Sequence, residues 1–362
     1  MVTSPFSISN SRAGQGEIHL KLLPPNTPSF QSLNFTYPLK LVCSTPHKLY
    51  PSESLNEPEE NSTTPANVPL VFMLSYGGGL LPPDSISLLI TLEHGSRLTL
   101  TTQGSTKIFP SSSTTIPSTA ANHPYIPAIA SQTLTTTIHN HAALLLAPDP
   151  VQPFARSHYT QHQSFTLAPL ASLCLLDWIT EGRRARGESW QAGSWTGKNE
   201  IWREFPSSGC SAEKKTLMLR DAILLDNGPQ GPGQSSLQRE NIGVFGTIIL
   251  AGPLFERLGE FFVREFAAMP RIGGRRWGDE DDDAVDGLSE EEAKRLHSWR
   301  AKRMVQESQD RVLWTMAKVR GSVVVKFSAA ELEGGKRWIE SIWRWEGTIG
   351  REFGEGGFMC LR

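Results

Sequence analysis

Short stretches in which apolar and polar residues alternate recur through the first two thirds of the chain. In residues 16–23, Ile18, Leu20 and Leu22 are separated by polar residues, a spacing of two that places them on one face of a β-strand. The same signal, bounded by glycine, proline and serine, predicts further strands over 33–42, 71–74, 85–93, 97–102, 131–138, 142–146, 157–167, 172–176, 200–205, 216–225 and 242–250. With little helix between them, these strands favour a mainly β fold, a coiled or solenoid-like array of short, largely antiparallel strands.

The apolar spacing changes to three and four in the last third of the chain. Pro253 stands where a helix tolerates proline, and the apolar residues that follow form one stripe, which predicts a helix to Met269. Residues 311–327 predict a hairpin that turns at Arg320 and Gly321. Together with the two helices described next, the pattern gives two to three helices in the C-terminal third.

Two pairs of residues have the spacing of a helix capping box. Ser289 with Glu292 predicts the start of a charged helix that runs to about Glu307. Ser328 with Glu331 predicts a second capping box before a last helix.

Composition shifts divide the chain into regions. We expect a β-rich body over 14–250, a helix–strand–helix region over 251–346 packed on that body, and a tail over 347–362. Polar segments at 52–69 and 110–123 are rich in Pro, Ser and Thr and read as disordered insertions, and 279–286 is an acidic run.

Charge and cysteine usage narrow the class of protein. The chain has 362 residues and a formal net charge of −2, which argues against nucleic acid as a partner because phosphate binding needs a basic face. The four cysteines lie far apart, so we expect buried free thiols in a reducing compartment. The first fifteen residues lack an apolar core and the longest apolar runs are short, so we expect a cytoplasmic protein that does not enter a membrane.

The glycine-rich segments do not form a nucleotide site or a nucleophile elbow. Residues 77–79 and 228–235 lack both the dinucleotide spacing and the Gly-Lys-Ser/Thr ending of a phosphate loop. In residues 193–197 the serine follows a glycine directly, so the hydrolase spacing is wrong.

Histidines offer a weak metal signal. His139 and His141 would share one face of a strand, and His158 and His162 would approach each other only if their segment curls. Imidazole suits nickel and zinc, but no third ligand has a fixed spacing to either pair, so partly exposed structural histidines are the simpler interpretation.

Residues 177–190 (Asp-Trp-Ile-Thr-Glu-Gly-Arg-Arg-Ala-Arg-Gly-Glu-Ser-Trp) carry the densest charge pattern. No apolar stripe runs through this segment, which makes it poor core material and predicts an ion-paired loop or a docking surface after the strand 172–176.

Several acids stand in apolar or turn contexts, namely Asp84, Asp149, Asp177, Glu188 and Asp221. They cap turns or pair with arginine, or alternatively line a polar passage through the β-domain that a hydrated divalent cation would favour.

Four phrases in order resemble the UreD (UreH) family of urease accessory proteins. Residues 78–84 are similar to its Gly-Gly-Leu-x-x-Gly-Asp, residues 101–109 to its Thr-Thr-Gln-x-x-Thr-Lys-Val-Tyr, residues 148–154 to its Pro-Asp-Pro-x-x-Pro-Phe, and residues 177–190 to its Asp-x-x-x-x-Gly-Arg-x-Ala-Arg-Gly-Glu-x-Trp. Pro83 and His158 depart from the family pattern, and the insertions indicate a eukaryotic, fungal-type member.

The resemblance implies a non-enzymatic maturation factor that helps deliver nickel to urease. Its implied partners are the urease apoprotein, a UreF-type accessory protein and, through UreF, the UreG GTPase, with no tightly bound cofactor and nickel bound only in transit. The metal-route candidates are Asp84, Asp177, Glu188 and Asp221, and the partner-binding or structural signature comprises Gly78, Gly79, Thr101, Gln103, Lys107, Asp149, Arg183, Arg186 and Trp190. The competing hypotheses are a β-rich ligand-binding module and a hydrolase, both unrelated to urease.

Overall fold

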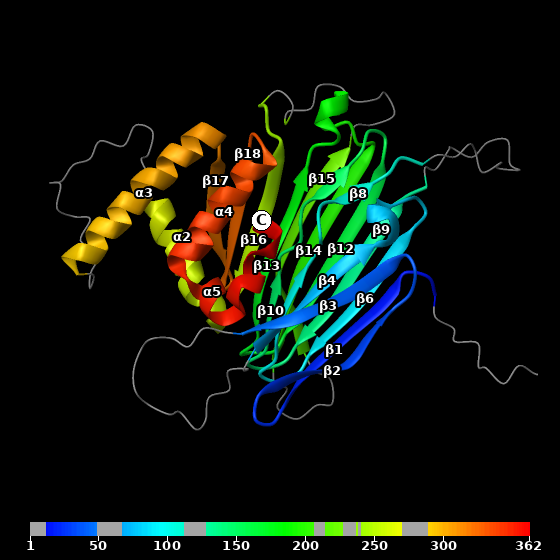
Figure 1. The fold of residues 1–362 in the computed structure, drawn as a ribbon, viewed down its shortest axis with the longest axis horizontal. Helices are drawn as coiled ribbons and strands as arrows, with labels where there is room; N and C mark the ends of the chain where they lie inside the picture. The colour runs from blue at the N-terminus through cyan, green and yellow to red at the C-terminus, as the bar shows by residue number, and fades with distance from the viewer. Residues whose placement is uncertain are drawn as a thin grey trace, which may run out of the picture.

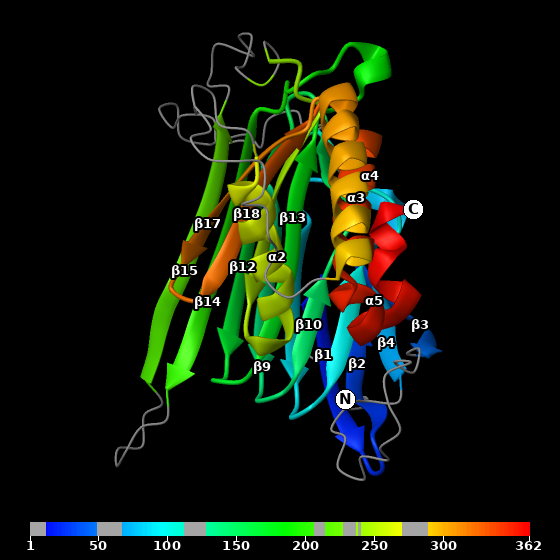
Figure 2. The same cartoon turned by 90° about the vertical axis from the view of Figure 1, so that its left-hand side faces the viewer.

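The chain folds into three layers, two β-sheets that face each other and a set of helices against the outer face of one sheet (Figure 1). The computed structural model describes residues 12–48, 67–111, 128–205, 214–226, 237, 240–269 and 289–362. Figure 2, turned by 90°, shows the helices on one side of the strands.

Within the described residues, sheet A has seven strands in the order β15–β14–β12–β9–β6–β1–β2. The five inner strands are parallel to one another, whereas β2 and β15 pair antiparallel at the two edges. The strands are β1 (Gln15–Leu23), β2 (Thr27–Phe35), β6 (Ser85–Leu92), β9 (Ala130–Ile138), β12 (His158–Leu167), β14 (Ser194–Phe205) and β15 (Lys214–Asp226).

Sheet B has eleven strands in the part of the chain that the structure describes, and its main path runs β17–β18–β16–β13–β10–β7–β4–β3. The four strands β13, β10, β7 and β4 are parallel, and the outer ones pair antiparallel. The strands are β3 (Leu39–Lys48), β4 (Asn67–Ser75), β5 (Gly79–Leu80), β7 (Arg97–Thr101), β8 (Thr106–Ile108), β10 (Ala143–Leu146), β11 (Val151–Pro153), β13 (Ser172–Thr180), β16 (Val244–Ala251), β17 (Leu313–Val319) and β18 (Ser322–Ala329).

The helical layer comes from the last third of the chain. Its α-helices are α2 (Glu256–Ala267), α3 (Glu290–Asp310), α4 (Leu332–Glu346) and α5 (Thr348–Phe353), and the 3-10 turns are η1 (Tyr76–Gly78), η2 (Arg184–Arg186), η3 (Pro253–Phe255) and η4 (Gly354–Leu361). No helix among these described residues is long and apolar enough to cross a bilayer.

The predicted mainly β class is confirmed, since about half of the residues that the structure describes, 49%, lie in strands. The largely antiparallel arrangement is confirmed only in part. Between β6 and β14 the chain passes back and forth between the two sheets, so neighbours within a sheet are not consecutive in sequence and run in the same direction. The structure therefore supports two mixed sheets, which is a coarser description than the solenoid-like array we predicted.

Two apolar cores hold the layers together. One lies between the sheets and contains inward residues such as Ile90, Phe165 and Leu175, all fully buried. The other lies between sheet B and the helices and contains Trp178, Ile248 and Trp338. Because sheet B is covered on both faces, its central strands consist of nearly continuous apolar residues.

The predicted helices are confirmed, except for one predicted capping box and for the number of helices. Ser289 and Glu292 form the expected capping box, and the hairpin of β17 and β18 turns at the predicted place. The second capping box was wrong, because Ser328 lies within β18 and no side chain caps α4. The described residues contain four α-helices rather than two to three.

The proposed regions share secondary structure. The boundary at residue 250 falls near the end of β16, yet β18 pairs with β16, so the body and the second region contribute to one sheet. Residues 347–362, expected as a tail, form α5 and η4 and bury Phe353 and Phe358. The division itself stays a prediction.

Several predictions fall wholly or mostly outside the described residues. These are the insertions at 52–69 and 110–123, the acidic run 279–286 and the loop 228–235, although residues 67–69 belong to β4 rather than to an insertion. Of the cysteines, Cys174 and Cys360 are buried as expected, whereas Cys43 is exposed, and Cys210 lies outside the description.

A network of ion pairs around Glu200 lies on the outer face of sheet A, and it should make the stability of the protein depend on pH. Glu200 accepts from Lys198 at 2.7 Å and from Arg220 at 2.8 Å, and with His162 these contacts lower the pKa of its carboxyl to about 2. Since the pKa in the folded state lies below the ordinary value of 4.5, the stabilisation is complete above that value and is lost as pH falls toward 2.

We therefore expect Glu200→Gln to lower the free energy of unfolding at pH 6, on the order of 1 kcal/mol, and to have less effect near pH 3. Urea unfolding at both pH values measures this difference, with the surface variant Glu17→Gln as control. An equal deficit at both pH values would contradict the ionic explanation.

Candidate functional site

Asp177 lies in the space between the sheets rather than in a loop. The strand predicted over 172–176 extends to Thr180, so the expectation that residues 177–190 form an ion-paired loop or a docking surface was wrong for the first four of them. Along β13, Leu173, Leu175 and Asp177 point toward sheet A, and the Asp177 side chain is only 4% exposed.

A polar stripe crosses the inner face of sheet A opposite Asp177. Gln161 donates from Nε2 to Asp177 Oδ1 at 2.9 Å, and Asn199 donates from Nδ2 to Oδ2 at 2.6 Å. Gln163 in turn donates to Asn199 Oδ1 at 3.1 Å, and Tyr159 donates to Gln161 Oε1. These buried amides orient one another and hold the carboxylate by two charge-assisted hydrogen bonds.

A second carboxylate continues this stripe toward the edge of the sandwich. Asp221 is the cross-strand partner of Asn199 in sheet A, and Thr247 of sheet B donates to Asp221 Oδ2 at 3.2 Å. Lys326 on β18 donates to Asp221 Oδ1 at 2.6 Å, and the Lys326 side chain is 45% exposed. The stripe therefore connects buried Asp177 with the protein surface.

The other end of the stripe reaches a small internal cavity. This cavity of about 20 Å³ is lined by Asp149, Gln161, Gln163 and Asp177, together with Gln132, Thr102 and apolar neighbours. Such a volume is about that of one water-sized sphere, and its polar lining offers the partners that a water needs. The interior of the sandwich thus contains a continuous polar strip within an apolar core.

Burial dominates the electrostatics of Asp177. Desolvation raises the pKa of this carboxyl, the bonds from Asn199 and Gln161 oppose the rise, and Asp221 adds repulsion that Lys326 partly offsets. The environment thus makes a charge on Asp177 costly, which an approaching cation would relieve.

Asp149 makes hydrogen bonds to the turn that follows β7. Its Oδ2 accepts from the Gly104 amide at 2.9 Å and from Thr102 Oγ1, while its own amide donates to Thr102 Oγ1. Burial raises the pKa of this carboxyl. The bonds of Asp149 to Thr102 and Gly104 join the two motif phrases at 101–109 and 148–154. Thr101 donates to the Ala147 carbonyl at 2.7 Å, just before the second phrase, and Gln103 at the turn is exposed.

The loop after β13 is held by an internal ion pair. Arg183 forms a bidentate pair with Glu188, and its guanidinium lies 4.3 Å from the centre of the Phe154 ring. This pairing lowers the pKa of Glu188, which also accepts from the Ala155 amide at 3.2 Å. The predicted pairing of arginine with carboxylate occurs here, and the oxygens of Glu188 are already engaged.

The remaining residues of the loop divide into exposed and buried groups. Arg184, with a 53% exposed side chain, and Arg186 point outward, whereas Trp190 is 5% exposed and donates to the Ile242 carbonyl at 2.5 Å. The loop therefore has a fixed base and an exposed surface with two arginines, of which Arg184 lies 3.5 Å from both Glu181 and Glu331.

The glycine phrase forms a tight turn beside sheet B. A Cβ at Gly79 would lie 2.3 Å from the Lys107 carbonyl oxygen, so this close strand contact excludes a side chain, while Gly78 has a φ of +73°. Asp84 accepts from the Leu81 amide at 3.0 Å and closes the next turn, and Lys107 is exposed. The structure thus brings Asp177 and Asp221 together but gives Asp84 and Glu188 separate local contacts.

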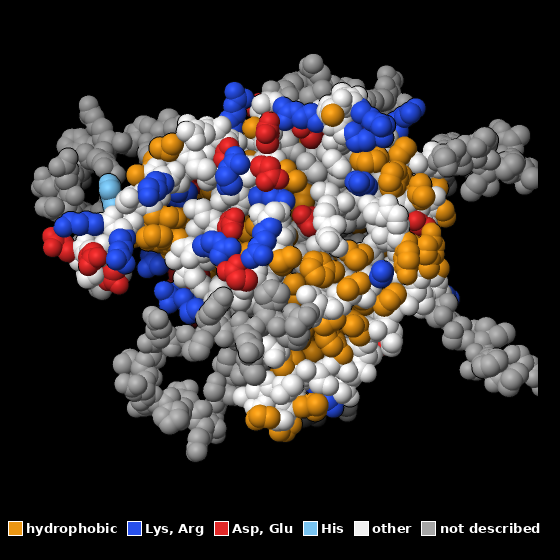
Figure 3. Space-filling view, viewed as in Figure 1, with side chains coloured by type: hydrophobic (Ala, Val, Ile, Leu, Met, Phe, Trp, Pro, Cys, Tyr) orange, Lys and Arg blue, Asp and Glu red, His pale blue; other side chains and the backbone are white. Residues whose placement is uncertain are grey.

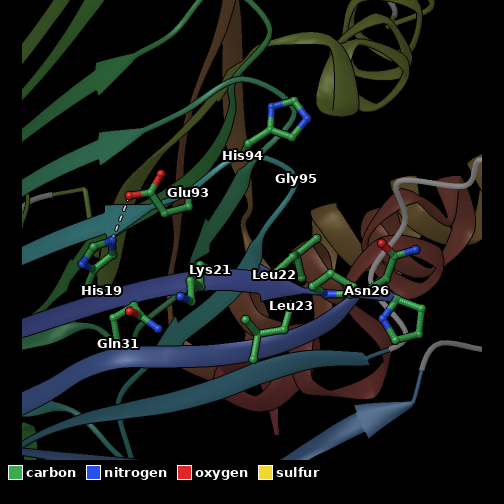
Figure 4. Close-up of a pocket in the computed structure, with 11 residues that line it drawn as sticks. His19, Lys21, Leu22, Leu23, Asn26, Gln31, Glu93, His94 and Gly95 are labelled. Carbon is green, nitrogen blue, oxygen red and sulfur yellow. Dashed lines mark hydrogen bonds and ion pairs between the residues drawn. The ribbon is translucent and has the colours of Figure 1, made fainter.

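His139 and His141 lie at the turn between β9 and β10 rather than on a strand. His139 follows β9, and His141 has a φ of +60°, so the expected shared strand face was wrong. A surface hollow of about 710 Å³ lies between the β1–β2 turn and the β6–β7 turn, and in it His19 Nε2 lies 2.9 Å from Glu93 Oε1 (Figure 4). Among the described residues, no group of three or more His, Cys, Asp or Glu side chains is arranged to hold a metal ion.

Sequence reasoning missed the amides and the lysine that complete the polar stripe. Gln161, Gln163 and Asn199 lie at alternate, inward positions of strands that also carry apolar inward residues. An inward polar position on a strand was the available signal, but it does not identify the side chain opposite.

Comparison with known proteins shows a match to one family model and to several relatives. Residues 31–353 match the family model described as UreD urease accessory protein. A Schizosaccharomyces pombe protein named "Uncharacterized urease accessory protein ureD-like" is 26% identical over 84% of this chain and 88% of its own length. "Urease accessory protein 4" of Cryptococcus neoformans is 32% identical over 67% and 71%, and "Urease accessory protein D" of Arabidopsis thaliana is 33% identical over 41% and 46%.

Proposed function

Because this chain belongs to the UreD family of urease accessory proteins, we propose that it serves urease maturation as a scaffold that performs no catalytic step and through which nickel reaches the apoprotein. Nickel is the cargo in this proposal, and the chain retains no tightly bound cofactor. The predicted cytoplasmic location remains part of the proposal.

The observation that supports nickel passage is the polar stripe from the cavity beside Asp149, past Asp177, to Asp221. Polar groups buried in an apolar core reduce stability unless they are well paired. Their concentration along one line therefore supports a functional role for the stripe. Carboxylate and amide oxygens bind a divalent cation without the strong thiolate or imidazole ligands that would retain it. A cation could then move by exchange of ligands and water.

The proposed route uses Asp177 and Asp221. Asp84 and Glu188, the other two candidate acids, are engaged in a turn and in an ion pair, which favours structural roles for them. Lys107 and Arg183 also belong to the supporting structure in this proposal.

The proposed partner surface includes the exposed part of the loop after β13. Its arginines Arg184 and Arg186 project from a base fixed by Glu188 and Trp190. In the face of the molecule drawn in Figure 3, charged side chains cover much of the helical layer, and hydrophobic side chains gather over the strands. We propose that such surfaces bind the urease apoprotein and a UreF-type protein, which would bring the UreG GTPase.

A co-expression pull-down tests the scaffold proposal. We expect the chain to recover apo-urease and the UreF-type protein, and we expect Arg186→Glu to weaken recovery by about tenfold because charge reversal opposes an electrostatically matched partner. The matched control is Lys294→Glu, a charge reversal at a 76% exposed side chain on α3.

Two outcomes would count against this proposal. Recovery of neither partner by the native chain would contradict the scaffold function, and equal weakening by the two reversals would contradict the role of the loop. The alternatives, a β-rich ligand-binding module or a hydrolase, would instead give a bound small molecule or turnover without urease.

A further inference from the structure

We infer that Lys326 is an internal counter-cation: its ammonium group occupies the Asp221 end of the polar stripe and has to leave before a divalent cation can bind there. This inference rests on the proposed nickel route and adds to it a residue that controls access. The geometry of Lys326 supports it in three steps.

The first step is the position of the ammonium group. Lys326 Nζ lies 2.6 Å from Asp221 Oδ1, and the Asp221 side chain is 12% exposed whereas the Lys326 side chain is 45% exposed. The lysine thus reaches from the surface to a mostly covered carboxylate. It occupies the coordination space on that oxygen that an entering cation would use.

The second step is the register position of Lys326 in sheet B. Asp177, Thr247 and Lys326 are cross-strand neighbours on β13, β16 and β18. Thr247 and Asn199 each bond to one of the two acids, so Lys326 lies at the outer end of a row that leads directly to Asp177. Release of Lys326 would free Asp221 at the entrance of this row.

The third step is the kind of contact. A lysine ammonium is a point charge on a flexible stem, so it can exchange one oxygen for water at small cost. Arg183 on Glu188 provides the contrast, since its bidentate pairing uses both carboxylate oxygens and its guanidinium also lies over Phe154. The pair at Asp221 therefore suits exchange, whereas the pair at Glu188 suits a fixed loop.

The test is nickel binding by the purified full-length chain, measured with nickel chloride by isothermal titration calorimetry at fixed ionic strength. We expect Lys326→Met to tighten nickel binding about five- to tenfold, because it removes a competing charge and frees Asp221. Lys326→Arg retains the charge and should not tighten binding. Lys318→Met, at an exposed position of the same hairpin, is the matched control.

A double-variant comparison locates the effect at Asp221. In an Asp221→Asn background, Lys326→Met should change the affinity less than twofold, since the carboxylate that both cations share is gone. Thermal unfolding of every variant confirms that the protein folds. If Lys326→Met is unstable, Lys326→Arg still tests the inference, because tighter nickel binding by Lys326→Arg would contradict it.

The outcomes separate this inference from the proposed function. No tightening in Lys326→Met beyond that in Lys318→Met, or no measurable nickel binding by either, overturns the counter-cation role. The nickel content of urease matured in cells is a separate readout. Tightening by Lys326→Met, together with maturation that does not require this chain, would support the inference and reject the proposed function.

Discussion

Asp177→Ala is expected to lower the nickel content and the activity of urease by about tenfold or more, the scale typical of removing a group that supports a metal site. Asp177 is the most buried acid of the polar stripe, and its carboxylate joins the amides of sheet A to the row on sheet B. Without it, the stripe has no charged ligand between the cavity and Asp221.

The chain itself should still fold and bind its partners. Burial raises the pKa of Asp177, so its removal also relieves the cost of a charged group in the core, while Gln161 and Asn199 lose an acceptor. These opposing effects predict a change in unfolding free energy on the order of 1–2 kcal/mol. The measurement is urease nickel per active site, with pull-down of the assembled complex in parallel.

Two control variants sharpen this experiment. Asp226→Ala removes an exposed acid at the end of β15, and Asp84→Ala removes the acid that closes a turn; neither lies on the proposed route. Normal maturation with Asp177→Ala would reject the acid route. A loss with Asp84→Ala equal to that with Asp177→Ala, in intact complexes, would place the route elsewhere.

Glu265→Ala is expected to reduce the free energy of unfolding by about 3–5 kcal/mol, the usual cost of removing one partner from a buried ion pair. Glu265 on α2 is 2% exposed and accepts from Arg300 and Arg303 of α3 at 2.9–3.1 Å. Arg303 is itself 3% exposed and would be left with Glu307 as its remaining carboxylate partner. The main consequence should be loss of the contact between α2 and α3.

Urea unfolding followed by circular dichroism measures this loss, and Glu260→Ala on the exposed face of α2 is the matched control. The control should change stability by less than about 0.5 kcal/mol. A double variant with Arg303→Met should recover part of the stability, because it removes the buried charge that Glu265→Ala leaves behind. A loss below 1 kcal/mol in Glu265→Ala would show that Glu307 alone can neutralise Arg303.

The local features of this fold follow from short stretches of sequence. The spacing of two around Ile18 and Leu20 identified β1, and the Ser289–Glu292 pair identified the start of α3. These features depend on residues a few positions apart, so the sequence contains all the information that they need. The four ordered phrases likewise indicated the family that the comparisons then established.

Sheet direction and the buried site did not follow from local pattern. Parallel pairing arises because the chain alternates between two sheets, and that course is set by contacts between residues far apart in the sequence. Asp177 was placed in a charged loop because its neighbours toward Trp190 are polar, yet the strand continues through it and buries it.

The sequence by itself thus determined most of the strands, the start of α3, the mainly β class and the family, because each depends on nearby residues or on the order of the four phrases along the chain. It merged the end of β2 and the start of β3 into one predicted strand over 33–42. Only the tertiary structure decided which side chains meet Asp177. Asn199 lies 22 residues away from it, and Lys326 lies 105 residues from Asp221. Such contacts are set by the register between distant strands, and a shift of one residue would turn every one of these side chains to the opposite face.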